Sequence, residues 1–294
     1  MTIAFVTTAD LDRPTGAGGS TREIIAAMKA VRPDVTVLNG HPARQLRFYD
    51  RLRSFDPDAV ICRTNASMVG PAMYCRQSET PFIGWVRGQE TDWVRRHHSR
   101  PVAAGLRRSI RWIYRQLDHA CVAYPEIKTE LPDSVPVTVV PNASNEGLFH
   151  PDVSPRRLPE KTIIYSGGLA ERHCVDQIFK LTNTGSPTVV IGDGPERERV
   201  QRVASHNPLL SYCGVVEREK VPNWVAGAEV GFVPFHPDIV SCPVKMYEYE
   251  AVGLDILTND PDRLQYFRDV DDLGLNATWC HRADQLFEVV DRYV

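Results

Sequence analysis

Short apolar runs alternate with amphipathic segments along most of the chain. In the first half, the runs are rich in Val, Ile and Phe, and a segment with helical periodicity follows most of them. This alternation predicts a parallel β-sheet that is covered by helices on both faces. The expected strands are Ile3–Thr7, Val35–Leu38, Ala59–Cys62, Phe82–Val86, His119–Ala123 and Val137–Val140, and the expected helices are Ser20–Val31, Ala43–Phe55, Met68–Gln77, Ala103–Leu117 and Glu126–Leu131.

A proline-rich segment, His150–Pro159, interrupts the alternation and predicts an interdomain linker. The alternation then restarts, so we predict two α/β domains, 1–152 and 153–294. Two doubly wound domains in tandem are expected to bind ligands at the carboxyl ends of their strands, in a cleft between them. The expected second-half elements are strands Thr162–Tyr165, Thr188–Ile191, Leu210–Tyr212, Val230–Val233 and Asp255–Leu257, and helices Val175–Leu181, Glu196–Ser205, Lys220–Ala226, Val244–Val252 and Ala283–Tyr293.

Composition narrows the possible functions. The formal net charge is −3, so a global basic field for nucleic acid is missing. Seven scattered cysteines without a C-x-x-C pair argue against a disulfide framework or a zinc site, and a reducing cytoplasm is the expected location. Apolar runs are too short to span a bilayer, and the first residues predict a buried strand rather than a signal peptide.

The first candidate motif is Thr15–Ser20, between the first strand and the first helix. Gly16, Gly18 and Gly19 would allow an anion or a sugar to approach the backbone closely. A helix beginning near Ser20 would direct its free N–H groups at such a ligand. The alternative is a flexible connection without function. The glycines do not match G-x-G-x-x-G, which disfavours a dinucleotide site.

The second candidate motif is Tyr165–His173, where Gly167 and Gly168 precede Arg172 and His173. A diphosphate is bound by backbone N–H groups together with a positive side chain, and this turn could supply both. The alternative is a solvent-exposed loop with an incidental arginine.

Two further motifs follow in the second half. A well-formed turn at Val190–Glu196, which contains Gly192, is mainly structural, with backbone that could lie close to a nucleotide. In Val240–Gly253, Lys245 and Glu248 are three residues apart and share one face at the start of a helix. Glu248 could accept hydrogen bonds from ribose hydroxyls and Lys245 could balance phosphate charge. A surface ion pair is the alternative.

These motifs, in this order, resemble glycosyltransferase family 4, whose members are retaining enzymes with the GT-B fold. The resemblance covers nearly the whole chain. It implies an α/β fold of two Rossmann-like domains with a cleft between them, the first on the acceptor side and the second holding a nucleotide-diphosphate sugar. The segments that carry the resemblance are Val140–Pro151, Val190–Glu196, Gly214–Trp224 and Pro243–Gly253.

The resemblance also implies roles for individual residues. Glu248 matches a glutamate expected near the ribose, and Lys245 matches a frequent basic position beside it. Arg172 or His173 falls where the family has a phosphate-binding lysine, and Arg87 lies where it has a histidine. Gly168 replaces a common arginine, and Val240 replaces the first motif glutamate. The candidate catalytic residues are Arg87, Arg172, Lys245 and Glu248, and the candidate donor-binding residues are Gly16, Gly18, Gly19, Gly167, Gly168, His173, Gly192, Gly214, Val215, Cys242 and Pro243.

The activity implied by the resemblance is transfer of a sugar, with retained configuration, to a glycan, a lipid-linked or another hydroxyl acceptor. No cofactor beyond the donor substrate is expected. The resemblance also implies that no metal ion is needed, because helix N-termini and cationic side chains would stabilise the leaving diphosphate. A catalytically silent binding subunit and a sugar-nucleotide epimerase are the alternatives.

A basic segment stands apart from these motifs. Seven arginines lie between Arg95 and Arg115, beside an apolar stripe at helical spacing. The segment could dock to anionic lipid, which would suit peripheral membrane contact and a lipid-linked acceptor. The alternative is a core-packed helix with a solvated basic face, and the charge pattern favours this second interpretation. The stripe consists of Leu106, Ile110, Ile113 and Leu117.

Overall fold

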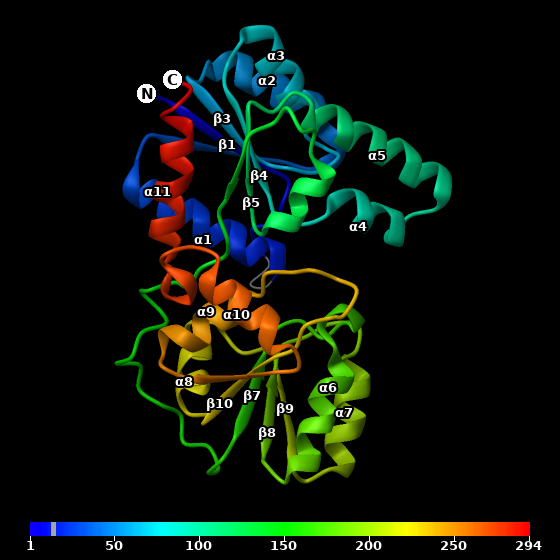
Figure 1. Cartoon of the computed structure of the whole chain (residues 1–294), viewed down its shortest axis with the longest axis vertical. Helices are drawn as coiled ribbons and strands as arrows, with labels where there is room; N and C mark the ends of the chain where they lie inside the picture. Colours follow the sequence, from blue (N-terminus) through cyan, green and yellow to red (C-terminus); the bar gives the residue numbers. More distant parts are fainter. Residues whose placement is uncertain (13–15) are drawn as a thin grey trace. The chain divides into compact units, whose positions relative to one another are not determined.

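The computed structural model describes residues 1–12 and 16–294, which form two compact units (Figure 1). Unit 1 comprises Met1–Leu11, Thr21–Pro141 and Cys280–Val294. Unit 2 is built on Asn142–Trp279 and includes the described part of Asp12–Ser20. The division into domains at 152/153 remains a prediction, and the compact units differ from it because residues 280–294 pack with unit 1.

Unit 1 contains a six-stranded sheet in the order β2-β1-β3-β4-β5-β6. All its strand pairs are parallel. β1 and β4 are buried along their whole length, as expected for a sheet with helices on both faces. Its elements are β1 (Ile3–Thr7), β2 (Val35–Asn39), β3 (Ala59–Arg63), β4 (Phe82–Val86), β5 (His119–Val122), β6 (Val137–Val139), α1 (Gly16–Val31), α2 (Gln45–Phe55), α3 (Val69–Ser78), α4 (Glu90–His97), α5 (Arg100–Tyr114) and α11 (Trp279–Val290), with short 3₁₀ turns η1 (Pro42–Arg44) and η2 (Pro125–Glu130).

Unit 2 contains a five-stranded sheet in the order β11-β10-β7-β8-β9, and its strand pairs are also parallel. Its core lies between the sheet and α6 and α7, around Tyr165, Ile178 and Val200. Its elements are β7 (Ile163–Ser166), β8 (Thr188–Ile191), β9 (Leu210–Gly214), β10 (Val230–Val233), β11 (Asp255–Thr258), α6 (Val175–Leu181), α7 (Arg197–His206), α8 (Val221–Ala226), α9 (Val244–Ala251) and α10 (Pro261–Asp269), with 3₁₀ turns η3 (Glu171–His173), η4 (Thr182–Thr184), η5 (Arg218–Lys220) and η6 (Gly274–Asn276).

The predicted fold class is confirmed, and each predicted strand is present within one or two residues of its expected bounds. Two helices, α4 and α10, were not predicted. The predicted helix at Glu126–Leu131 is instead the 3₁₀ segment η2, which opens with Pro125. The first helix begins at Gly16 rather than near Ser20, so the expectation of a glycine loop before it is wrong for Gly16, Gly18 and Gly19.

The strand order places a topological switch point in each sheet. In unit 2, β7 lies between β8 and β10, so the chain leaves β7 towards one side and leaves β10 towards the other. In unit 1, the corresponding point lies between β1 and β3. Ligands of open parallel sheets bind beyond the carboxyl ends of the strands at such points. The loops after β7 and β10 are therefore the first place to look for a site.

The last helix belongs to unit 1 through specific contacts. Arg32 forms an ion pair with Asp291 at 2.6 Å, and His119 Nδ1 lies 3.0 Å from the Tyr293 hydroxyl. These contacts attach the end of the chain to α1 and β5.

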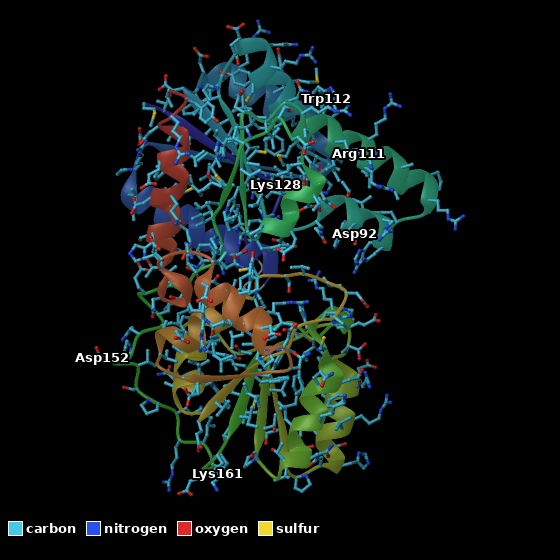
Figure 2. All side chains as sticks on the ribbon, in the orientation of Figure 1. Asp92, Arg111, Trp112, Lys128, Asp152 and Lys161 are labelled. Carbon is cyan, nitrogen blue, oxygen red and sulfur yellow. The ribbon has the colours of Figure 1, made fainter. Side chains whose placement is uncertain are left out.

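The predicted linker has no regular structure over residues 153–159 and runs along unit 2, where Figure 2 labels Asp152 and Lys161 close to its two ends. The Arg156 guanidinium lies 4.0 Å above the Trp224 ring. Its backbone N–H donates to the Asn223 carbonyl at 2.8 Å. The segment is thus fixed to α8 rather than left in solvent.

Candidate functional site

The turn after β7 makes an unusually close backbone contact with the turn after β8. Gly167 has φ +142° and Gly192 has φ +133°, both in a region that favours glycine. Gly167 N–H donates to the Ile191 carbonyl at 3.0 Å. A Cβ atom at residue 192 would lie 1.8 Å from the Gly167 carbonyl oxygen. Only glycine fits at position 192, so the two turns form one rigid backbone surface.

Lys245, in the first turn of α9, reaches this surface. Its Nζ atom lies 3.5 Å from the centroid of the Tyr165 ring. A Cβ atom at residue 167 would lie 2.9 Å from the same Nζ, so the glycine leaves room for the ammonium group. Among the described residues, no hydrogen bond or ion pair to Lys245 Nζ is present. Burial lowers the pKa of Lys245 to about 7, although the charge of Glu248 opposes part of this shift.

His173 occupies the space beside the second glycine of the turn. A Cβ atom at residue 168 would lie 2.6 Å from His173 Cε1, so a larger residue at 168 would displace the imidazole. Burial, and then the positive charges of Lys245 and Arg172, lower the pKa of His173 to about 3. The imidazole is therefore neutral near pH 7. The exposed Arg172 side chain donates from Nε to His173 Nε2 at 3.3 Å.

Glu248 has a partner that the sequence did not reveal. Arg218, in η5, forms an ion pair with Glu248 Oε1 at 2.7 Å. The Glu248 side chain is 7% exposed and the Arg218 side chain 19%. The Arg218 guanidinium also lies 4.7 Å above the Phe149 ring. The only sequence signal was that Arg218 falls inside the segment Gly214–Trp224 that carries the family resemblance.

The remaining unit 2 candidates border the same edge of the sheet. Gly214 ends β9 with φ +69°, and its carbonyl accepts from Gly192 N–H at 2.7 Å. Val215 follows it and is 59% exposed. The Cys242 carbonyl accepts a hydrogen bond from the Asn142 side chain. Pro243 then precedes the first residue of α9.

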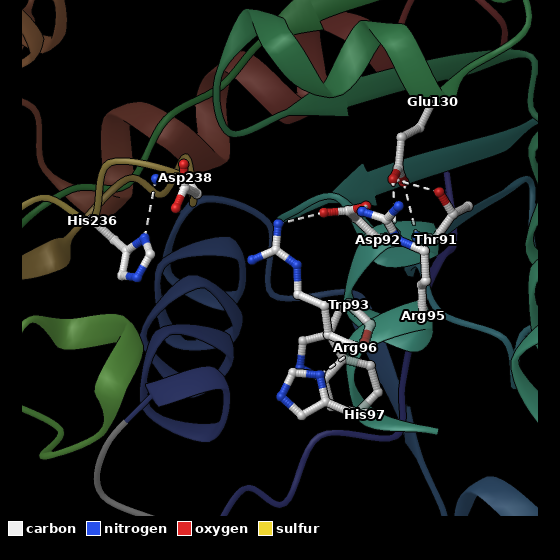
Figure 3. Close-up of polar contacts among 9 residues, drawn as sticks. All are labelled: Thr91, Asp92, Trp93, Arg95, Arg96, His97, Glu130, His236 and Asp238. Carbon is white, nitrogen blue, oxygen red and sulfur yellow. Dashed lines mark hydrogen bonds and ion pairs between the residues drawn. The ribbon is translucent and has the colours of Figure 1, made fainter. Parts of the chain in front are cut away.

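The loop from β10 to α9 folds back on itself. His236 and Ile239 form an isolated antiparallel bridge, and His236 Nδ1 accepts from Asp238 N–H at 3.1 Å (Figure 3). Arg263 of α10 donates to the His236 carbonyl at 2.8 Å. These contacts hold the polypeptide that leads into α9 and Lys245.

In unit 1, Arg87 directly follows β4. Its Nη1 donates to the Val140 carbonyl at 3.0 Å, and its guanidinium lies 4.5 Å above the Trp85 ring. Gly16 and Gly18, which cluster with unit 2, lie in the first turn of α1, so their N–H groups belong to the free donors of the helix N-terminus, and Gly19 follows them. Thr15 lies outside the described residues.

The helix that follows Arg87 is anchored by an acidic side chain. The Glu130 carboxylate accepts from Thr91 N–H at 3.0 Å, from the Thr91 hydroxyl at 2.6 Å and from Asp92 N–H at 3.2 Å (Figure 3). A carboxylate at this position satisfies free N–H groups in the first turn of α4 and complements the helix dipole. This long-range cap explains why α4 forms although its sequence is strongly polar.

Two searches of the described residues bear on other classes of protein. They contain no group of three or more His, Cys, Asp or Glu side chains arranged to hold a metal ion. In the same part of the chain, no helix has the length and apolar character needed to cross a membrane.

The structure therefore brings most predicted unit 2 residues together within that unit. Lys245 and His173 fill the two places that Gly167 and Gly168 leave open, and Gly192 and Gly214 continue the same backbone surface. Glu248 lies one helical turn beyond Lys245 and faces Arg218. Arg87 lies at the end of β4, and Gly16, Gly18 and Gly19 lie at the start of α1.

No family model and no curated protein matches the chain. Solved structures do. HepE from Anabaena in complex with UDP has a TM-score of 0.70 at 11% identity, over 99% of this chain and 100% of HepE. Sucrose-phosphate synthase from Thermosynechococcus elongatus has a TM-score of 0.68 at 13% identity, over 99% of this chain and 90% of the synthase.

A third match is a putative UDP-N-acetylglucosamine 2-epimerase from Listeria monocytogenes, with a TM-score of 0.56 at 9% identity, over 99% of this chain and 88% of the epimerase. At such identities the likeness concerns the fold. The chain has the α/β fold of the GT-B glycosyltransferases, with two sheets of parallel strands and interleaved helices.

Proposed function

We propose that the chain is a glycosyltransferase that takes a sugar from a nucleotide-diphosphate donor held by unit 2. The observation that carries the proposal is Lys245: a desolvated ammonium group at the switch point of the sheet, beside a glycine turn. Burying such a cation costs stability, because its charged form loses hydration. Buried ionisable groups with a strongly shifted pKa are often found at functional sites. An anionic ligand would offset the hydration that the Lys245 ammonium loses.

The diphosphate would lie against the turn after β7. The Gly168 backbone N–H, the N-terminus of α9 and the Lys245 ammonium would all face negative charge, while the Gly167 N–H holds the turn in place through the Ile191 carbonyl. Such groups stabilise a leaving diphosphate without a metal ion, because they supply positive charge that is already oriented. HepE, the similar protein named above, has been crystallised with UDP and with UDP-glucose, which supports a nucleoside diphosphate as ligand.

The ribose would be held by Glu248. Its carboxylate can accept hydrogen bonds from ribose hydroxyls, while Arg218 fixes its orientation from the other side. Arg172, which is exposed at the mouth of the turn, would add a second positive charge next to the phosphates.

The structure offers a reason why Gly168 can replace the arginine that is common at this position of the family. His173 fills the space that an arginine at 168 would need, and Lys245 Nζ lies above the preceding glycine. We therefore assign the main positive charge that binds the phosphates to Lys245 on α9, rather than to a residue in the loop after β7.

The acceptor would be a glycan, a lipid-linked or another hydroxyl compound, bound by unit 1 near Arg87. Transfer would occur by front-face substitution with retained configuration, and the protein would contribute positioning and charge stabilisation. The protein would act in the cytoplasm, with peripheral contact to a membrane where the acceptor is lipid-linked.

A thermal-shift screen of nucleoside diphosphates and their sugars tests the donor assignment. A ligand present at a hundred times its dissociation constant adds ~2.7 kcal/mol of stability, which is easily measured. The purified chain should then transfer or hydrolyse the donor that it binds. Binding without turnover would favour a silent binding subunit, and release of a free epimer without acceptor would favour an epimerase. No shift with any nucleotide would overturn the proposal.

A further inference from the structure

The segment around α4 and α5 has a charge unlike that of the rest of the chain. Seven arginines lie between residues 95 and 115, and the sequence from Trp93 to Leu117 contains no Asp or Glu. The whole chain nevertheless has a net charge of −3. The segment therefore carries a local excess of positive charge.

The structure separates the two interpretations of this segment that the sequence left open. In the second half of α5, Ile110 and Ile113 are buried against unit 1, as is Leu117 just beyond the helix. That half is a core-packed helix, so its apolar stripe cannot enter a membrane. The first turns of α5 behave differently, because Pro101, Val102, Ala104 and Gly105 are all exposed.

We name the exposed residues of the segment Trp93–Arg108 the α4–α5 tip. It contains two of the large apolar side chains that are exposed in the described chain: Trp93 is 44% exposed and Val102 is 50% exposed. The Trp93 ring stacks on the His97 ring at 4.5 Å (Figure 3). In Figure 1, the turn that joins α4 to α5 lies away from the sheet of unit 1. The tip is thus accessible from that unit's surface.

Arginines surround these apolar residues. Arg95 and Arg96 each form an ion pair with Asp92 at 2.6 Å, which leaves one carboxylate shared by two cations. Arg100 and Arg108 are exposed and form no ion pair with any described residue. Arg111, on the same helix, is exposed as well (Figure 2). The tip therefore has an excess of positive charge that its own unit does not neutralise.

We propose that the α4–α5 tip docks the protein onto an anionic lipid bilayer. Basic side chains near such a surface contribute about 1 kcal/mol each, and tryptophan favours the headgroup region. Exposed Val102 and Pro101 can enter the acyl boundary but offer nothing to a nucleotide base, so lipid fits this surface better than nucleic acid. The docking specifies a partner beyond the proposed donor chemistry, and it does not depend on sugar transfer.

The test uses the full chain and needs no sugar nucleotide, so its failure is distinguishable from failure of the proposed function. Sedimentation is measured with phosphatidylcholine vesicles, with and without phosphatidylglycerol. The expected result is binding to the anionic vesicles only, weakened by salt because the attraction is electrostatic.

Two variants and a control define the surface. The double variant Arg100→Glu, Arg108→Glu should lower the vesicle partition coefficient at least ~25-fold, from about fivefold for each arginine lost. Trp93→Ala, which keeps every arginine, should lower it several-fold. The control Arg53→Glu, Arg202→Glu makes the same charge change at exposed arginines on α2 and α7 and should change it less than about threefold. Circular dichroism and thermal unfolding verify that each variant is folded.

Three results would overturn the proposal. The first is no binding to anionic vesicles, the second is an equal loss in the control variant, and the third is equal binding to neutral vesicles. Tight binding to single-stranded RNA without binding to vesicles would also contradict it and would assign the tip to nucleic acid.

Discussion

The carboxyl edges of the two sheets each place a cation on an aromatic ring, but the two cations are held differently. Arg87 lies 4.5 Å above Trp85 and donates to the Val140 carbonyl, so it is attached to the scaffold of unit 1. Lys245 lies 3.5 Å from the Tyr165 ring, and none of the described residues gives its Nζ a hydrogen bond or ion pair. The scaffold of unit 1 therefore orients Arg87, whereas Lys245 is available for an anion.

The chemistry of the two side chains strengthens this difference. A guanidinium stays charged in any protein environment, whereas a buried ammonium shifts its pKa readily. Burial lowers the pKa of Lys245 to about 7, so its charge depends on pH in the neutral range. We therefore expect ligand binding in unit 2 to depend on the protonation of Lys245. The role of Arg87 in unit 1 should not depend on pH in this range.

The largest expected effect comes from Gly192→Ala. The new Cβ would lie 1.8 Å from the Gly167 carbonyl oxygen, and the residue would keep a positive φ. We expect a loss of about 3 kcal/mol in the free energy of unfolding, from overpacking together with backbone strain. Gly185→Ala is the matched control, because φ is +81° there but its Cβ would meet no atom within 4 Å. Urea unfolding measures both, and equal losses would show that the close approach of the two turns is unimportant.

Glu248→Ala should have the next largest effect. It removes the carboxylate that pairs with the partly buried Arg218, which we expect to cost about 2 kcal/mol of stability, below the value for fully buried pairs. Nucleotide affinity should also fall by about 1.5–3 kcal/mol. Glu250→Ala, which breaks a more exposed pair with Arg268, should cost under about 1 kcal/mol. Calorimetry that finds unchanged nucleotide affinity in Glu248→Ala would remove Glu248 from the donor site.

Arg87→Ala tests the role of the cation in unit 1. Losing the contact with Trp85 should cost about 0.5–1 kcal/mol of stability. If Arg87 acts on the acceptor or the departing phosphate, transfer should fall about tenfold or more while nucleotide affinity changes little. Transfer rates and calorimetric titrations of the same preparation check this. A parallel loss of both quantities would move the acceptor away from Arg87.

The smallest expected effect is that of a chelator. The proposed site stabilises the diphosphate with Lys245 and backbone N–H groups, so EDTA should leave the transfer rate unchanged. If EDTA abolished transfer and added magnesium or manganese restored it, the assignment of that charge to Lys245 would be wrong.

The strand positions and fold class were predictable from the sequence because buried parallel strands are continuous apolar runs bounded by turn residues. α4 was not predicted, since its polar sequence depends on Glu130, almost forty residues later, to cap its first turn. α10 was also missed, although Asp260-Pro261 is a local helix start in which the Asp260 side chain accepts from Arg263 N–H. The formation of α4 depends on a tertiary contact, whereas the start of α10 has a local sequence signal.

The candidate site was predictable in its residue types but not in its pairings. Motif order identifies the glycines and Lys245, but only the folded structure shows why glycine is needed: Gly167 leaves room for Lys245, and Gly168 leaves room for His173. Arg218 has no distinctive local pattern, and only folding brings it to Glu248. Pairings between distant segments are set by packing, which a single sequence does not encode in a readable form.

The most direct test of the central claim is calorimetric titration of the chain and of Lys245→Met with UDP and other nucleoside diphosphates. Lys180→Met, a change at an exposed lysine on α6, serves as control. An anion favours the charged ammonium, so binding should take up protons at pH 8 and weaken as pH rises through 7. Lys245→Met should bind about 10- to 100-fold more weakly, without proton uptake. Tight, pH-independent binding by Lys245→Met, or no binding by the unmodified chain, would contradict the account.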